Sequence, residues 1–221
     1  RIFDQYKAQR PETPQELRDQ FQRVKQMMKA FKVPIVEFEG YEADDVIGTL
    51  CSLAEGKGIE SLILTGDTDT LQLVSPLVRV ALQNRVQDRK VYDECAVKER
   101  YGGLSPAQHI DFKALKGDPS DNIPGVPGVG EKTAIKLLLA YGSIEGIYQR
   151  IQEVNPPKLR EILLKNRDQA FTCKKLTTIV KKLPLELDME TSRFAQFDRA
   201  EVVNLFRELE FFTIAENIPR T

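Results

Sequence analysis

Residues 116–134 read KGDPSDNIPGVPGVGEKTA, and this stretch decides how the second half of the chain is interpreted. Gly125, Gly128 and Gly130 precede a helical pattern, so backbone N–H groups are left free where a helix begins. Such N–H groups bind phosphate, glycines allow a close approach, and Lys132 adds a positive charge. The spacing therefore predicts a site that holds phosphate groups through the backbone.

The surroundings of these glycines distinguish between known kinds of phosphate site. A Rossmann site is excluded because the motif does not follow a strand, and Pro124 and Pro127 suit a hairpin. A P-loop is excluded because its Gly-Lys-Ser/Thr ending is absent. A helix–hairpin–helix over residues 106–141 remains, and contacts to backbone phosphates carry no base information. We therefore expect binding to duplex DNA without sequence preference; a tight turn with a purely structural role is the alternative.

Strand and helix patterns alternate in the first part of the chain, which predicts an α/β fold with a parallel sheet. Ser61–Thr65 is typical of a buried parallel strand. The other expected elements are a helix from Pro14 to about Lys32, a strand at Pro34–Phe38, a helix at 42–54, and strands at 78–82 and 90–92. The apolar stripe of the first of these helices is expected to consist of Leu17, Phe21, Val24, Met28 and Phe31. After residue 93 the pattern is helical, with helices expected at 93–101, 106–116, 131–141, 143–152, 156–180 and 198–209.

Seven acidic residues lie at the edges of three of these elements. Glu42, Asp44 and Asp45 open a helix, Asp67 and Asp69 follow the buried strand, and Asp118 and Asp121 lie in the stretch quoted first. Carboxylates gathered together raise one another's pKa values, and divalent cations relieve that repulsion. Hard oxygen ligands without His or Cys predict two Mg²⁺ or Mn²⁺ ions, which can activate water and stabilise the leaving oxygen in phosphodiester hydrolysis.

Each acidic cluster also has a structural interpretation. The acids at 42–45 are of the kind that the macrodipole favours where a helix begins. Asp67 and Asp69 suit an Asx-turn and a helix cap, and Asp118 and Asp121 suit a solvated loop. The three clusters together favour the metal interpretation, and the sequence alone does not show that they meet in space.

Composition limits the remaining classes of function. The 221 residues are 41% hydrophobic and 29% charged, with no apolar run long enough to cross a membrane. A single histidine, His109, leaves carboxylate and metal chemistry as the main route for a hydrolase. Cys51, Cys95 and Cys173 are far apart and form no CxxC pair, so a zinc or disulfide framework is not expected and a reducing cytoplasm fits best. The net charge of −1 does not by itself indicate nucleic acid.

The chain resembles the 5′-nuclease domain of bacterial DNA polymerase I and its relatives, the flap endonucleases. The matching segments are EGYEADDV at 39–46, LTGDTD at 64–69 and the stretch at 116–134, and their order and approximate spacing match as well. The resemblance implies a PIN-like, mostly parallel sheet with flanking helices, followed by a helical, helix–three-turn–helix DNA-binding part. We expect the nuclease core at 1–92, with the base of a helical arch at 1–12, and the DNA-binding part at 93–221.

The resemblance also implies roles for particular residues. It places Glu42, Asp44, Asp45 and Asp67 near one metal ion and Asp69, Asp118 and Asp121 towards the other. Lys7 and Arg10 would act with Asp67 in catalysis by steering or polarising the scissile phosphate. DNA contacts would come from Tyr6, Lys7, Arg10, Lys116, Gly125, Gly128, Gly130, Lys132 and Thr133, with a potassium ion on the hairpin carbonyls.

The implied activity is structure-specific hydrolysis of DNA at 5′ flaps, nicks and 5′ ends, by a monomer near the nucleoid in the bacterial cytoplasm. Whether a polymerase domain follows Thr221 is left open. The family has two strands before the arch, each carrying an aspartate of the metal site, and the sequence given starts after both. We therefore keep a non-catalytic DNA-binding fragment as the second hypothesis and a pure interaction scaffold as the third.

Overall fold

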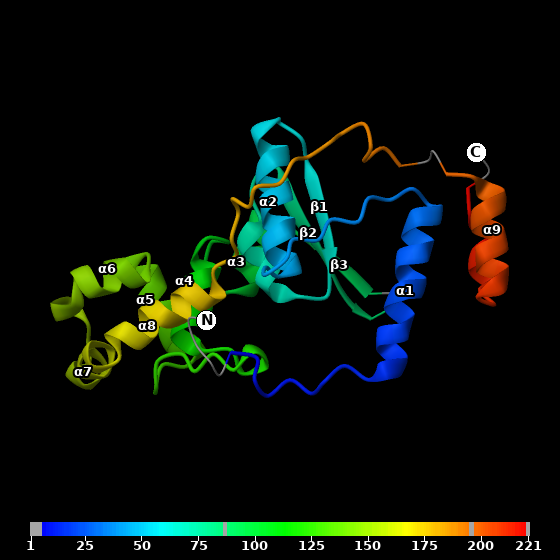
Figure 1. Ribbon diagram of the computed structural model, residues 1–221. Helices are drawn as coiled ribbons and strands as arrows, with labels where there is room; N and C mark the ends of the chain where they lie inside the picture. The colour runs from blue at the N-terminus through cyan, green and yellow to red at the C-terminus, as the bar shows by residue number, and fades with distance from the viewer. Residues whose placement is uncertain (1–5, 86–87, 195–196, 220–221) are drawn as a thin grey trace. The chain divides into compact units, whose positions relative to one another are not determined.

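The computed structural model describes residues 6–85, 88–194 and 197–219 (Figure 1). The described residues belong to two compact units: one contains Arg1–Arg10 and Tyr41–Leu185, and the other contains Pro11–Gly40 and Glu186–Thr221. The first five residues of the expected arch segment lie outside the described residues.

The sheet of the first unit is formed by β1 (Ser61–Thr65), β2 (Val78–Arg85) and β3 (Asp88–Tyr92), in that order. β1 and β2 are parallel, with Ser61 opposite Val78, and β2 and β3 are antiparallel. One face of the sheet is buried, because Val78, Val80 and Leu82 are fully enclosed. The predicted α/β class, with a parallel strand pair, is confirmed.

The parallel connection from β1 to β2 carries a short 3₁₀ helix, η1 (Thr68–Leu73), directly after β1. The helix α2 (Ala43–Gly56) lies beside β1 and contacts η1 (Figure 1). Apolar side chains of α2, η1 and the strands form one core, which includes Cys51 and Leu71. The beginning of α2 and the beginning of η1 are therefore held on one compact body.

A second core of the same unit is entirely helical. It is built from α4 (Gln108–Lys116), α5 (Glu131–Tyr141), α6 (Ile144–Gln149), α7 (Pro157–Lys165) and α8 (Arg167–Thr177) with their connecting loops, in which the 3₁₀ turns η2 (Pro119–Asp121) and η3 (Ile151–Glu153) lie. The helix α3 (Glu94–Arg100) contributes Val97 to the first core. The predicted single helix at 156–180 is wrong: it is divided at Asn166, whose side-chain Nδ2 donates to the Ile162 carbonyl at 2.7 Å. α4 packs against both α5 and α8 (Figure 1).

The other unit contains α1 (Gln15–Ala30), α9 (Arg199–Glu208) and α10 (Phe212–Ala215). Two expectations are wrong here. Pro34–Phe38 is neither strand nor helix, and the predicted apolar stripe of α1 is exposed at Leu17, Phe21 and Val24. The small core of this unit combines Ala30 with residues of α9, and Phe31 of the predicted stripe packs against it. No helix in the described part of the chain is long and apolar enough to cross a membrane.

Candidate metal and DNA site

The first acidic cluster lies where α2 begins, and one of its members is used by the backbone. Asp45 accepts hydrogen bonds from the N–H groups of Glu42 at 3.2 Å and Val180 at 2.8 Å, one on each carboxylate oxygen. Asp44 is half-buried, and burial together with the negative charges of Asp67 and Glu42 raises its pKa above the ordinary value. Asp44 therefore lies near enough to both Asp67 and Glu42 for repulsion, as expected of a cation-binding group.

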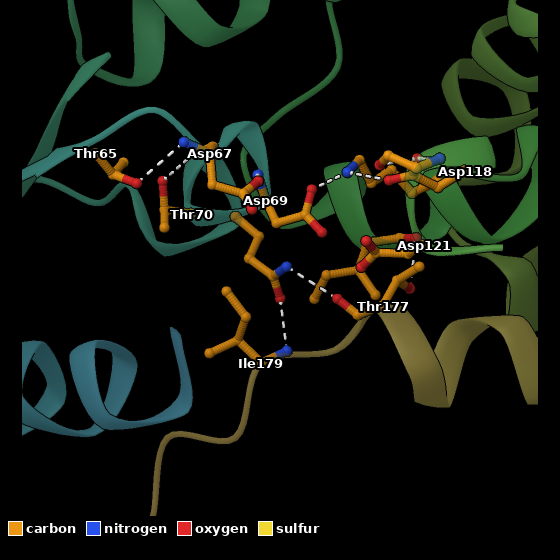
Figure 2. A network of polar contacts seen from close by, with 12 residues as sticks. Thr65, Asp67, Asp69, Thr70, Asp118, Asp121, Thr177 and Ile179 are labelled. Carbon is orange, nitrogen blue, oxygen red and sulfur yellow. Dashed lines mark hydrogen bonds and ion pairs between the residues drawn. The ribbon is translucent and has the colours of Figure 1, made fainter. Parts of the chain in front are cut away.

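The second cluster is fixed by an Asx-turn at the end of β1. Oδ1 of Asp67 accepts a hydrogen bond from the Asp69 N–H at 2.9 Å (Figure 2). The Asp67 N–H donates to the Thr65 hydroxyl at 3.0 Å, and the Asp67 carbonyl accepts from the Thr70 hydroxyl at 2.8 Å. These bonds hold the turn closed and direct the Asp69 side chain away from Asp67, toward α4. The predicted Asx-turn thus coexists with a position for both carboxylates at the strand end, where α/β proteins bind ligands.

The third cluster is built into the loop after α4. Asp118 begins η2 and accepts two hydrogen bonds from Ser120, from its N–H at 2.9 Å and its hydroxyl at 2.6 Å. Asp118 and Ile123 exchange both backbone hydrogen bonds at 2.8 Å, so the loop is a closed miniature hairpin. The carboxylates of Asp118 and Asp121 are 11% and 8% exposed. Such enclosure of two carboxylates requires a cation nearby.

Lys113 of α4 brings the second and third clusters together. Its Nζ contacts Asp69 Oδ1 and lies 2.7 Å from Asp118 Oδ2, and Figure 2 shows the two acids facing each other across these ion pairs. Burial opposes ionisation of Asp118, but the hydrogen bonds from Lys113 and Ser120 lower its pKa below the ordinary value. Both carboxylates are therefore within reach of one small cation.

The chain segment before the first cluster also converges on these acids. Asp121 receives Arg10 Nη2 at 2.5 Å, the Tyr6 hydroxyl at 3.2 Å and the Lys7 backbone N–H at 3.0 Å. The Lys7 side chain bridges Glu42 and Asp121, with 3.7 Å to the latter. Lys7 thus links the first and third clusters, as Lys113 links the second and third, and Arg10 adds a second cation to Asp121.

The acids meet in pairs in the described part of the chain. No three His, Cys, Asp or Glu side chains among the described residues are grouped as a metal site. Mg²⁺ commonly binds proteins through one or two carboxylates and keeps several waters. Asp69 and Asp118 supply two such oxygens at one point, and apart from Lys113 nothing among the described residues donates to the buried Asp69 Oδ1. This pair fits a Mg²⁺ or Mn²⁺ ion.

A cavity of about 390 Å³ adjoins this pair of acids and is lined by both charged and aromatic side chains. Asp67, Lys113 and Asp118 line it together with Arg100 and Tyr101. His109 also lines it, but the imidazole is 2% exposed, and burial lowers its pKa to about 4. His109 is therefore a neutral, packed side chain, as expected for a structural histidine.

The hairpin between α4 and α5 separates the predicted glycines into two groups. Gly125 is buried, its φ is +65°, and an added Cβ would lie 2.3 Å from the backbone nitrogen of Gly117. Its carbonyl accepts a 2.5 Å hydrogen bond from Gln169 of α8. Gly128 and Gly130 are exposed, and Gly130 immediately precedes α5. Gly125 thus allows two backbones to touch, whereas the other two leave the beginning of α5 open.

The remaining predicted DNA residues lie beside this opening. Lys132 is exposed and Thr133 is half-buried in the first turn of α5. Lys116 pairs with Glu131 at 3.2 Å and lies over the Phe112 ring at 5.3 Å. The sequence did not single out Lys113, or Gln72 of η1, whose side chain bonds to the end of α8. Both residues make their contacts with segments far along the chain, and no local pattern distinguishes them from other polar residues.

Two family models cover nearly the whole chain. The model of the 5′-3′ exonuclease N-terminal resolvase-like domain matches residues 1–102, and that of the 5′-3′ exonuclease C-terminal SAM fold matches residues 104–200. The DNA polymerase I of Chloroflexus aurantiacus is 46% identical over 95% of this chain and 22% of its own length. That of Bacillus caldotenax is 44% identical over 98% of this chain and 25% of its own length. The chain thus spans about a quarter of these curated relatives.

Solved structures of similar fold come from more distant proteins. The bacteriophage T5 D15 flap endonuclease, in a pseudo-enzyme-product complex with DNA and metal ions, has a TM-score of 0.68 and 20% identity, over 97% of this chain and 78% of its own. The catalytic core of Rad2 in complex with DNA substrate has a TM-score of 0.61 and 15% identity, over 97% of this chain and 73% of its own. At these identities the likeness shows the fold.

Proposed function

The chain belongs to the 5′-3′ exonuclease family, and from this we propose that it hydrolyses DNA phosphodiester bonds at 5′ flaps, nicks and 5′ ends with two Mg²⁺ or Mn²⁺ ions. The observation that carries the proposal is the meeting of Asp69 and Asp118 across Lys113. The two acids come from separate cores of one unit, and a structural role in either turn does not require them to face each other.

The proposed ligand set divides into two groups. Glu42, Asp44, Asp45 and Asp67 serve one ion, and Asp69, Asp118 and Asp121 serve the other. Ions in these places supply Lewis acidity that activates water and stabilises charge on the leaving oxygen. Asp45 has a further task, because its two backbone hydrogen bonds hold Glu42 and the beginning of α2 in place.

Lys7 and Arg10 provide positive charge for the scissile phosphate. Their partners Glu42 and Asp121 are the acids that would hold cations, so bound cations would free both side chains for the DNA. A guanidinium matches the oxygens of a phosphate bidentately, and an ammonium acts as a point charge. Tyr6 keeps this segment against Asp121, and burial raises the pKa of its hydroxyl to about 12, so it stays a hydrogen-bond donor.

The hairpin holds the duplex. Gly128, Gly130, Lys132 and Thr133 face phosphates where α5 begins, Lys116 adds charge nearby, and a potassium ion on the hairpin carbonyls is part of the proposal. Gly125 contributes indirectly, because its carbonyl is already bound by Gln169. These contacts address the backbone, so the site selects DNA structure and not sequence.

The proposal extends to organisation and setting. Residues 1–92 form the nuclease core and residues 93–221 the DNA-binding part, in a monomer of the bacterial cytoplasm that acts near the nucleoid, with a polymerase domain as its partner in a longer chain. The second candidate is a DNA-binding protein without catalysis. The observation that favours it is the absence of a three-acid group within the described ranges.

The deciding experiment uses a 5′-flap DNA labelled on the flap, incubated with the chain in MgCl₂ or in EDTA. The nuclease proposal predicts release of the flap in MgCl₂ only. Binding of the flap DNA without release in either condition would refute it and support the non-catalytic candidate. A single-stranded oligonucleotide of the flap sequence serves as the control for structure specificity.

A further inference from the structure

The side chain of Gln72 forms a buried clamp on the end of α8. Its Nε2 donates to the carbonyl of Thr177 at 2.9 Å, and its Oε1 accepts the N–H of Ile179 at 3.0 Å (Figure 2). Gln72 is 3% exposed and belongs to η1. One amide thus satisfies two main-chain groups of a segment that lies far along the chain.

The clamp acts on the helix that carries Asp69. Residues three apart in a 3₁₀ helix eclipse one another, so Asp69 and Gln72 project from the same side of η1. On that side, Asp69 meets Lys113 of α4 and Gln72 meets the end of α8. Because α4 and α8 pack together, Gln72 fixes the distance between η1 and the helix that leads to Asp118.

The segment that follows α8 is also tied to the first acidic cluster. Val180 donates to Asp45 Oδ1 at 2.8 Å, and Leu183 donates to the Thr49 hydroxyl at 3.2 Å. At the other end of α8, Gln169 holds the Gly125 carbonyl of the hairpin. A single continuous stretch, 169–183, therefore touches the hairpin, η1 and the beginning of α2.

We infer that Gln72 is a positioning residue for cleavage: it sets Asp67 and Asp69 against Asp118 by clamping η1 to the end of α8. This inference rests on the proposed function. A misplacement of about 1 Å in a catalytic group can lower a rate by about a hundredfold. The side-chain hydrogen bonds of Gln72 go to Thr177 and Ile179 and not to the acids, so its effect passes through the backbone of η1.

The clamp needs one donor and one acceptor on a side chain of this length, which the amide of Gln72 supplies at every pH. Gln72→Met keeps the shape and removes both hydrogen bonds. Gln72→Glu keeps the acceptor for Ile179, and its new carboxyl can donate to Thr177 only while protonated. Burial raises the pKa of such a carboxyl, so the clamp should open as the pH rises.

The test compares these two variants with the wild type and with Ser75→Ala. Ser75 follows η1, and its hydroxyl accepts the N–H groups of Leu77 at 3.2 Å and Val78 at 3.1 Å, so its loss disturbs the same region without touching the clamp. Three quantities are measured: single-turnover flap cleavage at saturating DNA, DNA affinity in EDTA, and Mn²⁺ affinity by electron paramagnetic resonance.

For Gln72→Met we expect cleavage slower by roughly tenfold or more and weaker Mn²⁺ binding, with DNA affinity in EDTA unchanged. For Gln72→Glu the cleavage rate relative to wild type should fall as the pH rises, while the ratios for Gln72→Met and Ser75→Ala stay flat. The inference would be overturned if Gln72→Met cleaved the flap and bound Mn²⁺ as well as the wild type. It would also be overturned if the cleavage rate of Gln72→Glu relative to the wild type did not change with pH.

Failure of the proposed function looks different. In that case the wild type itself leaves the flap intact, and the Mn²⁺ measurement alone decides about Gln72. Weaker Mn²⁺ binding in Gln72→Met with an unchanged affinity in Ser75→Ala then supports the clamp as the device that places the acids, and equal affinities refute it.

Discussion

Replacement of Lys113 by Met tests whether Asp69 and Asp118 form a cation site. The variant keeps the length of the side chain and removes the ammonium group that both acids share. Asp118 retains its two hydrogen bonds from Ser120, whereas Asp69 Oδ1 keeps no other donor among the described residues. Removal of the ammonium should therefore leave mainly the Asp69 carboxylate without a partner among the described residues.

The size of the stability loss in Lys113→Met follows from the burial of the three charged groups. Lys113, Asp69 and Asp118 are 13%, 15% and 11% exposed, so the group resembles a buried ion pair. Breaking such a pair costs about 3–5 kcal/mol, and the bonds that Asp118 retains favour the lower value of about 3 kcal/mol. For a chain of this size, that corresponds to a decrease in melting temperature of roughly 6–12 °C.

The assay is thermal unfolding in EDTA and in excess MgCl₂. The variant should melt lower in EDTA and regain most of the loss in MgCl₂, since a divalent ion replaces the missing charge and ligand binding at a hundredfold excess over Kd adds about 2.7 kcal/mol. Lys116→Met is the matched control on the same helix. Its partner Glu131 is 61% exposed, so the change should stay below about 1 kcal/mol and not respond to MgCl₂.

Two results would refute the reasoning. Equal melting temperatures of Lys113→Met and wild type in EDTA would show that the ammonium does not hold the two acids. A loss that MgCl₂ does not relieve would show that the acids are not a cation site.

Three further predictions concern the helical part. Burial keeps the pKa of Asp111 raised although Lys174 lies 2.7 Å away, so the folded protein still holds this proton above the ordinary pKa of about 3.9. The free energy of unfolding should therefore fall as the pH rises from the ordinary pKa to the raised one. Lys174→Met should raise the pKa of Asp111 further, so in urea unfolding this variant should lose more stability near pH 8 than near pH 5. Gly125→Ala places a Cβ 2.3 Å from a backbone nitrogen at a φ of +65°, so we expect a loss of roughly 2–5 kcal/mol in the same assay, against less than about 1 kcal/mol for Gly130→Ala, where the Cβ meets open space. Lys132→Ala should lower the slope of log affinity for duplex DNA against log salt by about 1, because one phosphate contact is lost. An unchanged slope would remove Lys132 from the proposed duplex contacts of the hairpin.

The sequence predicted the elements whose signals are local. Gly125 and Gly128 of the hairpin have positive φ, which glycine adopts without strain, and the structure has α4 and α5 on either side of them. The strand at Ser61–Thr65 and the helix after Glu42 were likewise evident from apolar patterning. The expectation that this strand is buried is wrong on one face, because Leu62 and Leu64 are 60% and 58% exposed.

Interactions between distant segments left no such signal. The amide of Gln72 and the ammonium of Lys113 resemble any polar residue on a helical pattern, and their partners are set by packing. Asp45 was predicted as a metal ligand from its neighbours, and the hydrogen bond from Val180 could not be foreseen because nothing in the sequence near Asp45 indicates it.

Periodicity predicts which face of a helix is apolar, but it does not predict which segment packs on that face. The stripe of Leu17, Phe21 and Val24 on α1 is amphipathic as predicted, yet those side chains are exposed. Pro34–Phe38 has the composition of a strand, but a strand requires a neighbour to pair with, and no strand pairs with it in the described ranges.

The central claim, that the acids form a catalytic metal site, is tested most directly by flap cleavage in Asp67→Ala. Wild type and variant are assayed on the same labelled 5′-flap DNA in MgCl₂, with binding measured in parallel in EDTA. We predict that the variant binds the DNA with about the wild-type affinity and releases no flap, because Asp67 lies just after β1 and near Asp44 while the hairpin is unchanged. Flap release by Asp67→Ala at the wild-type rate would contradict the account.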